Sequence, residues 1–106
     1  MKVNGALAIS DEELEAFCRR WKIQEFALFG SVLRDDFGPD SDIDVLVSFQ
    51  PEAEWDLWHV IEMQEELEAI FGRPVDLADR EAVERSDNPF RKRLILNGSQ
   101  VIYTRG

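Results

Sequence analysis

Two aspartates separated by one residue, Asp42 and Asp44, lead into the apolar run VLVSF. Side chains two residues apart on a strand point the same way, so both carboxylates would project from one face. Like charges this close repel, and in isolation one carboxylate would hold a proton. A divalent cation removes the conflict. Mg²⁺ fits because it takes oxygen ligands, keeps several waters and draws its remaining ligands from substrate phosphates.

A third carboxylate, Asp76, lies in the short apolar segment PVDLAD. This segment is predicted to be a strand, and its acid completes the site if that strand lies beside the one that carries Asp42 and Asp44. Three acids could then hold two ions. We therefore predict that Asp42, Asp44 and Asp76 are metal ligands.

Gly30 and Ser31 follow the aromatic run EFALF and precede SVLRD, a stretch able to form a short helix. A turn of this kind exposes backbone N–H groups at a helix start, where they and the helix dipole favour a phosphate. Glycine allows close approach, Ser31 adds a hydroxyl donor, and Arg34 can add charge from one turn further on. A surface ion pair is the alternative interpretation of Arg34.

The elements that must position these residues follow from hydrophobic periodicity and turn residues. Helices are expected over residues 10–21, 55–71 and 90–96, and strands over 25–30, 42–49, 74–79 and 100–103. Helices and strands alternate along a chain of 106 residues, a length that suits one domain spanning residues 1–106. We expect an α+β (mixed α/β) fold, with flanking helices on a small mixed sheet of about three to five strands.

Several other conspicuous residues are interpreted as structural. His59, the single histidine, lies inside a predicted helix without Cys or His at ligand spacing, so a metal role is disfavoured. Cys18 lies on an apolar helix face and resembles a buried small hydrophobe. Core packing or interface anchoring is favoured for the tryptophans, and a solvated helix face for the basic cluster. These residues are Trp21, Trp55 and Trp58, and Arg91, Lys92 and Arg93.

The amino-acid composition limits the kinds of binding partner that we expect. Acidic residues outnumber Lys and Arg by 22 to 12, and the formal net charge of -10 argues against broad electrostatic capture of nucleic acid. A basic partner or a cation-bridged ligand suits this charge better. The single cysteine and the lack of an apolar leader or membrane-spanning run lead us to expect a cytoplasmic protein without a membrane partner.

The GS pair, DSDIDVLV and the later VDL together resemble the nucleotidyltransferase superfamily typified by DNA polymerase beta. They look most like its minimal stand-alone MNT-type members, commonly the antitoxin half of HEPN/MNT pairs. The resemblance implies the nucleotidyltransferase fold, metal binding by Asp42 and Asp44, completion of the site by Asp76, and a triphosphate held by Gly30 and Ser31. The sequence departs from the usual small or glycine-rich loop after Arg34, where it carries a pair of aspartates.

The function that the resemblance implies is Mg²⁺-dependent transfer of a nucleoside monophosphate, AMP from ATP, to a hydroxyl of a partner protein. That partner would be a HEPN-type toxin, in a homo- or hetero-oligomer, and Asp76 would orient or deprotonate the acceptor hydroxyl. The alternative is a non-catalytic antitoxin that neutralises a HEPN-type ribonuclease by binding alone. A template-dependent polymerase is disfavoured because the sequence shows no thumb-like region or basic channel.

Overall fold

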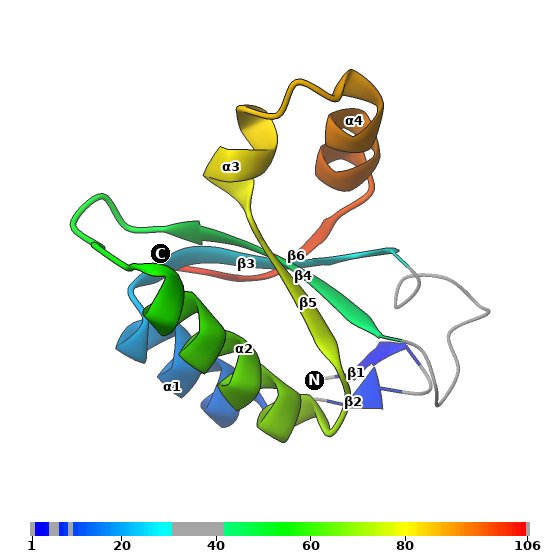
Figure 1. The fold of residues 1–106 in the computed structure, drawn as a ribbon. Coiled ribbons are helices and arrows are strands. Elements are labelled where there is room, and N and C mark those ends of the chain that lie inside the picture. The colour runs from blue at the N-terminus through cyan, green and yellow to red at the C-terminus, as the bar shows by residue number, and fades with distance from the viewer. Residues whose placement is uncertain (1, 5–6, 9, 31–41, 106) are drawn as a thin grey trace.

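The computed structural model describes residues 2–4, 7–8, 10–30 and 42–105 (Figure 1). The helices are α1 (Asp11–Arg20), α2 (Leu57–Phe71), α3 (Arg80–Glu84) and α4 (Pro89–Asn97). The strands are β1 (Lys2–Asn4), β2 (Leu7–Ala8), β3 (Ile23–Phe29), β4 (Ile43–Phe49), β5 (Val75–Asp79) and β6 (Gln100–Thr104). Helices cover both faces of a central sheet, with α1 and α2 on one side and α3 and α4 on the other (Figure 1).

The central sheet has four strands in the order β5-β4-β3-β6. β3 pairs antiparallel with both β4 and β6, whereas β4 and β5 are parallel. The parallel pair needs a crossover connection, and α2 supplies it between β4 and β5. The sheet is therefore mixed, as the sequence predicts, and a separate antiparallel pair, β1 and β2, precedes it.

The larger hydrophobic core lies between one face of the sheet and helices α1 and α2. Phe17 of α1 meets Phe26 of β3 edge to face, with ring centroids 6.2 Å apart. Met63 and Leu67 of α2 are fully buried in the same cluster. Alternate residues of β4 complete it, because every second side chain of a strand faces the same way. These residues are Ile43, Val45 and Val47.

A smaller core lies on the opposite face, under α3 and α4. Ala27 and Leu46 of the sheet pack here with Ile95 of α4, and Val83 of α3 is partly buried against them. Leu46 is two residues after Asp44 on β4, so Asp44 projects from this same face. The smaller core therefore fixes the side of the sheet on which the candidate site lies.

Local sequence signals set the boundaries of α2. Asp56 caps the N-terminus by accepting a hydrogen bond from the backbone N–H of His59 at 3.0 Å, and the N–H of Asp56 donates to Nδ1 of His59 at 3.3 Å. The bond from the His59 N–H is the main reason that the pKa of Asp56 is lowered. Gly72 ends the helix with φ of 70°, a left-handed conformation that glycine adopts without strain. His59 thus has the structural role that the sequence indicates.

The elements predicted within the described ranges are found with small boundary changes, and three described elements were not predicted. The short helix expected over residues 31–35 lies outside the described residues. Trp55 precedes α2 rather than belonging to it, and the predicted strand over residues 25–30 begins two residues earlier, at Ile23. The unpredicted elements are β1, β2 and α3, whose lengths of 3, 2 and 5 residues are too short for a periodic pattern. Within the described ranges, no helix combines the length and apolar character that crossing a membrane requires.

Candidate active site

Asp44 and Asp76 occupy paired positions on neighbouring strands. In the parallel ladder of β4 and β5, Asp44 is the partner of Asp76, flanked by the pairs Ile43 with Val75 and Val45 with Leu77. Paired residues of adjacent strands point to the same face, about 5 Å apart at Cα. Asp44 is half-buried and Asp76 is exposed. The fold thus brings together two of the three predicted acids from segments 32 residues apart.

Gly30 lies directly against Asp44. It follows Phe29, the partner of Asp44 in the antiparallel pairing of β3 with β4. Its φ is +75°, and a Cβ added here would overlap Oδ2 of Asp44 and approach its Cγ to 3.1 Å. Both the backbone conformation and the contact with Asp44 favour glycine. The structure shows a close approach of the Asp44 carboxylate to Gly30, and the close approach of a phosphate there stays a prediction.

Asp42 lies immediately before β4 and is exposed. The backbone N–H of Ile43 donates to the carbonyl of Pro74 at 3.0 Å, which fixes the start of β4 against the start of β5. Strand alternation would put Asp42 on the same side as Asp44, but Asp42 precedes β4, so this shared orientation stays a prediction. The predicted phosphate ligands Ser31 and Arg34 lie outside the described residues.

The carboxylates of Asp42, Asp44 and Asp76 are the candidate ligands of a metal ion. Across the described ranges, no group of three or more His, Cys, Asp or Glu side chains is gathered closely enough to hold a metal. The paired carboxylates of Asp44 and Asp76 nevertheless suit Mg²⁺, which proteins bind through one or two carboxylates while water and phosphate oxygens fill the remaining positions. Metal binding by Asp42, Asp44 and Asp76 stays a prediction.

A cavity of about 330 Å³ opens beside Asp76, between β5 and α3. Its walls combine small apolar side chains with the polar groups of Asp76, Asp79 and Ser86. The side chain of Asp79 accepts a hydrogen bond from the N–H of Glu81 at 3.0 Å, which caps α3 and fixes that helix over the end of β5. Ser86 was not singled out from the sequence, because its place next to Asp76 depends on the short helix α3.

Most of the residues interpreted as structural are buried or hydrogen-bonded within the fold. Cys18 is fully buried, and burial raises the pKa of its thiol to about 12. Trp21 is buried and donates its indole N–H to Oε2 of Glu66 at 2.8 Å, and Trp55 donates to the carbonyl of Trp21 at 2.8 Å. Trp58 is not a core residue, because 73% of it is exposed. The interface role that the sequence left open is the one compatible with this exposure.

A protein-family model described as "Nucleotidyltransferase domain" matches residues 11–102. The chain belongs to this nucleotidyltransferase family. A relative named protein adenylyltransferase MntA, from Thermococcus cleftensis, is 37% identical over 83 residues, covering 78% of this chain and 79% of the relative. A protein of Methanocaldococcus jannaschii is 34% identical over 76 residues, covering 72% of this chain and 73% of that protein.

Solved structures of toxin-antitoxin complexes contain a chain of the same fold. A toxin-antitoxin complex with AMP-PNP superimposes with a TM-score of 0.69 at 21% identity, covering 92% of this chain and 75% of the other. A complex of tri-AMPylated Shewanella oneidensis HEPN toxin with its MNT antitoxin gives a TM-score of 0.60 at 22% identity, covering 89% and 69%. These likenesses confirm the predicted fold.

Proposed function

We propose that this nucleotidyltransferase transfers AMP from ATP to a hydroxyl group of a HEPN-type partner protein and thereby acts as an antitoxin. The observation that carries the proposal is the register pairing of Asp44 with Asp76, beside a glycine whose left-handed conformation and contact with Asp44 disfavour any side chain. Two carboxylates of separate strands, side by side at an accessible sheet surface, repel each other, and a bound cation would stabilise the pair. A metal-bound triphosphate would supply that cation.

Each residue of the proposed site has a distinct task. Asp42, Asp44 and Asp76 would hold Mg²⁺, and Asp76 would in addition orient or deprotonate the acceptor hydroxyl. When bound, Mg²⁺ would stabilise the charge that develops on the attacking and leaving oxygens. The Gly30 backbone, with Ser31 and Arg34 after it, would contact the triphosphate and orient it for in-line displacement. Pyrophosphate is the leaving group.

The partner and the nucleotide are supported by the relatives. The Thermococcus cleftensis relative is named a protein adenylyltransferase, and the structural neighbours are toxin-antitoxin complexes with AMP-PNP or an AMPylated HEPN toxin. The charge of this chain agrees, because a formal net charge of -10 suits a basic protein that binds RNA better than it suits RNA itself. A cytoplasmic location is part of the same proposal.

The test is labelling of the partner. The parent protein is incubated with a purified HEPN-type candidate partner, ATP and Mg²⁺, and intact-mass spectrometry is expected to show added mass in steps of one AMP. The double variant Asp42→Asn/Asp44→Asn should bind the same partner and leave its mass unchanged. A partner that stays unlabelled by the parent protein would refute transfer to a HEPN-type acceptor.

The alternative, neutralisation by binding alone, makes the opposite prediction for that double variant. If Asp42→Asn/Asp44→Asn protects RNA from the partner ribonuclease as well as the parent does, the chemistry is dispensable and docking suffices. If protection is lost while the complex still forms, transfer is the mechanism of neutralisation. The acidic surface of the chain is the feature that favours a docking contribution.

A further inference from the structure

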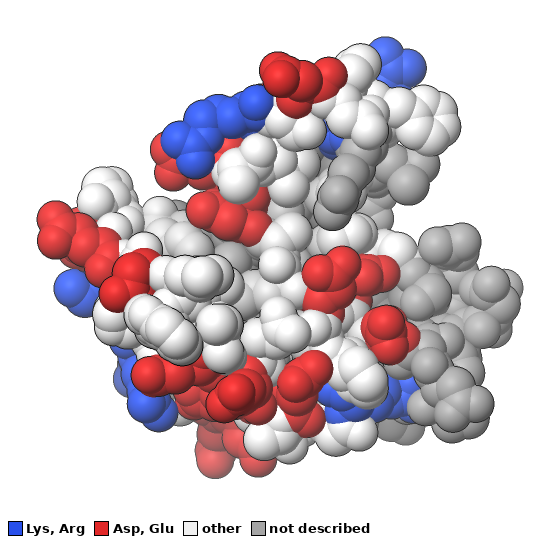
Figure 2. Space-filling view, viewed as in Figure 1, with Lys and Arg blue, Asp and Glu red and all other residues white. Residues whose placement is uncertain are grey.

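The N-terminal half of α2 carries an exposed apolar patch. Leu57 is 70% exposed, Trp58 73% and Ile61 41%. They are neighbours on the helix surface, because residues three and four apart lie side by side. Figure 2 shows uncharged surface over the start of this helix, with acidic side chains around it. A tryptophan and two aliphatic residues exposed together are typical of a protein interface rather than of free surface.

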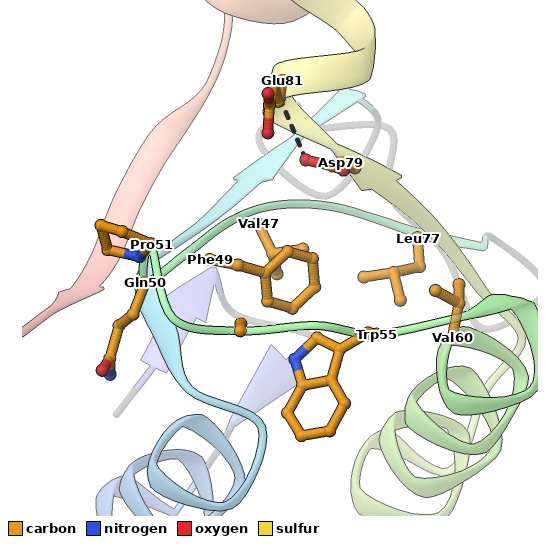
Figure 3. Close-up of a pocket in the computed structure, with 10 residues that line it drawn as sticks. Val47, Phe49, Gln50, Pro51, Trp55, Val60, Leu77, Asp79 and Glu81 are labelled. Atoms are coloured by element: carbon orange, nitrogen blue, oxygen red, sulfur yellow. Dashed lines mark hydrogen bonds between the residues drawn. The ribbon is translucent and has the colours of Figure 1, made fainter.

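A cavity of about 370 Å³ continues this patch toward the sheet. Val60, three residues after Leu57, lines the cavity together with Trp55 and Phe49. Figure 3 shows these apolar side chains below and Asp79 and Glu81 at the opposite rim, with the hydrogen bond from the Glu81 N–H to Asp79 between them. The cavity therefore has apolar walls and an acidic rim. We call the exposed patch and this cavity together the α2 surface, formed by Leu57, Trp58, Ile61, Phe49, Trp55 and Val60.

Most charges around the α2 surface are negative, although the exposed Lys22 places its Nζ 6.0 Å from the centroid of the Trp55 ring. Glu54, Asp56, Glu62 and Glu65 are exposed on or just before α2, and Glu81 is exposed at the cavity rim. Glu62 is one helical turn after Trp58, and Glu65 is one turn after Ile61. A second copy of this chain would bring the same acids against them, at a cost from like charges. The complementary occupant is a protein with apolar anchors and basic residues around them, and a long Arg or Lys side chain suits the cavity.

The α2 surface lies apart from the candidate active site. Phe49 follows Asp44 by five residues, a distance of about 17 Å along a strand. Val47 and Leu77, which also line the cavity, belong to the face of the sheet under α1 and α2, whereas Asp44 and Asp76 project from the opposite face. A contact confined to the α2 surface therefore does not use these carboxylates.

We propose that the α2 surface is a docking site for a basic protein partner, which it holds while the aspartate site remains open for transfer. The proposal rests on the proposed function, because the partner to which it commits is the HEPN-type protein. It adds the place at which the partner binds, which is Trp58 and its neighbours on the α2 surface. Affinity for the partner and AMP transfer to it therefore depend on different residues. The docking surface controls the KM for the partner, and the aspartates control kcat.

The first experiment compares two substitutions of exposed apolar residues. Leu57→Gln/Trp58→Gln is tested for binding to the purified HEPN-type protein by calorimetry, with Phe90→Gln as the matched control, since Phe90 is 78% exposed on α4. The double variant is expected to weaken Kd at least tenfold and to raise the KM for partner labelling by a similar factor, with kcat unchanged. The control should bind and label like the parent. Circular dichroism checks that both variants are folded.

The second experiment tests the charge of the expected partner. Glu62→Lys/Glu65→Lys should slow association at least threefold at low salt and reduce its salt dependence. Glu12→Lys/Glu15→Lys, at two exposed positions of α1, is the control because it makes the same change of net charge. Equal effects of the two charge changes would mean that no localised charge complementarity exists, and would overturn a docking site of this chemistry.

The outcomes separate this proposal from the proposed function. If Leu57→Gln/Trp58→Gln binds the partner with parental affinity, the docking site is refuted while transfer to the partner stands. If Asp42→Asn/Asp44→Asn binds normally without labelling, the docking site stands and the chemistry is assigned to the aspartates. Sedimentation of the chain alone gives the remaining test, because a parent dimer that dissociates in the Leu57→Gln/Trp58→Gln variant would show that a second copy occupies this surface and would overturn the proposal.

Discussion

Gly30 lies so close to Asp44 that no side chain fits between them. A Cβ on Gly30 would overlap the Oδ2 atom of Asp44, and the φ of +75° is a conformation that L-residues rarely adopt. The end of β3 therefore limits the positions open to the Asp44 carboxylate. This contact connects the predicted phosphate-binding turn to the predicted metal ligand, two features that the sequence presents separately.

Gly30→Ala is expected to destabilise the protein and to displace Asp44. The left-handed conformation alone should cost about 1–2 kcal/mol, and the overlap with Asp44 should reduce AMP transfer at least 100-fold. Gly72→Ala is the matched control, because Gly72 has a similar φ of +70° with nothing within 4 Å of an added Cβ. It should lose similar stability and keep its activity. Equal activities of the two variants would show that the Gly30 contact with Asp44 is catalytically irrelevant.

Asp76→Asn should abolish transfer and leave the fold intact. The amide is nearly isosteric with the carboxylate and lies at an exposed position, so thermal stability should remain within about 0.5 kcal/mol of the parent. A general base or orienting group typically contributes about 10²- to 10⁴-fold to rate. The measurement is single-turnover labelling of the partner with ATP and Mg²⁺. Labelling at the parental rate would remove Asp76 from the mechanism.

Cys18 should be inert in the folded protein. Burial raises the pKa of its thiol from 9.0 to about 12, so the reactive thiolate is scarce at pH 8. Iodoacetamide should modify the denatured chain within minutes and the native chain at least 100-fold more slowly. Since the folded pKa is the higher one, Cys18 should contribute to stability below pH 9 and lose that contribution as pH rises toward 12. Rapid native alkylation would contradict this burial.

Two leucines of α2 should respond differently to truncation. Leu67 is fully buried in the larger core, so Leu67→Ala should lower the free energy of unfolding by about 2–5 kcal/mol. Leu57 is 70% exposed, and Leu57→Ala should change the free energy of unfolding by less than about 0.5 kcal/mol. Urea unfolding of both variants measures the difference. A large loss of stability in Leu57→Ala would mean that the α2 surface supports the fold rather than a partner.

Much of the fold could be predicted because its signals are local. The Ser10 cap is an example, since its side chain accepts a hydrogen bond from the N–H of Glu13 at 3.4 Å at the start of α1. The periodicity of α2 and the apolar run after Asp44 are equally local. Such signals involve residues that are close together in the sequence. Burial of the apolar face of an element then stabilises the structure that these signals favour. The type of each long element was therefore correctly predicted.

The short elements and the solvent exposure of individual side chains could not be predicted. The five residues of α3 carry no periodic signal, and that helix depends on the Asp79 cap and on packing against the smaller core. Trp58 illustrates the second difficulty, because its apolar character fits a core and an interface equally well until the helix is docked on the sheet. The two cavities depend on the same docking.

The sequence by itself determined which residues are the candidates for the chemistry, because the alternation of Asp42 and Asp44 before an apolar strand, and the acid in PVDLAD, are properties of the local chain. Only the tertiary structure decided that Asp44 pairs with Asp76 and that Gly30 lies against Asp44. Strand pairing across a helical crossover depends on packing energies summed over the whole core. A local sequence pattern does not specify which strands become neighbours or in what register they pair.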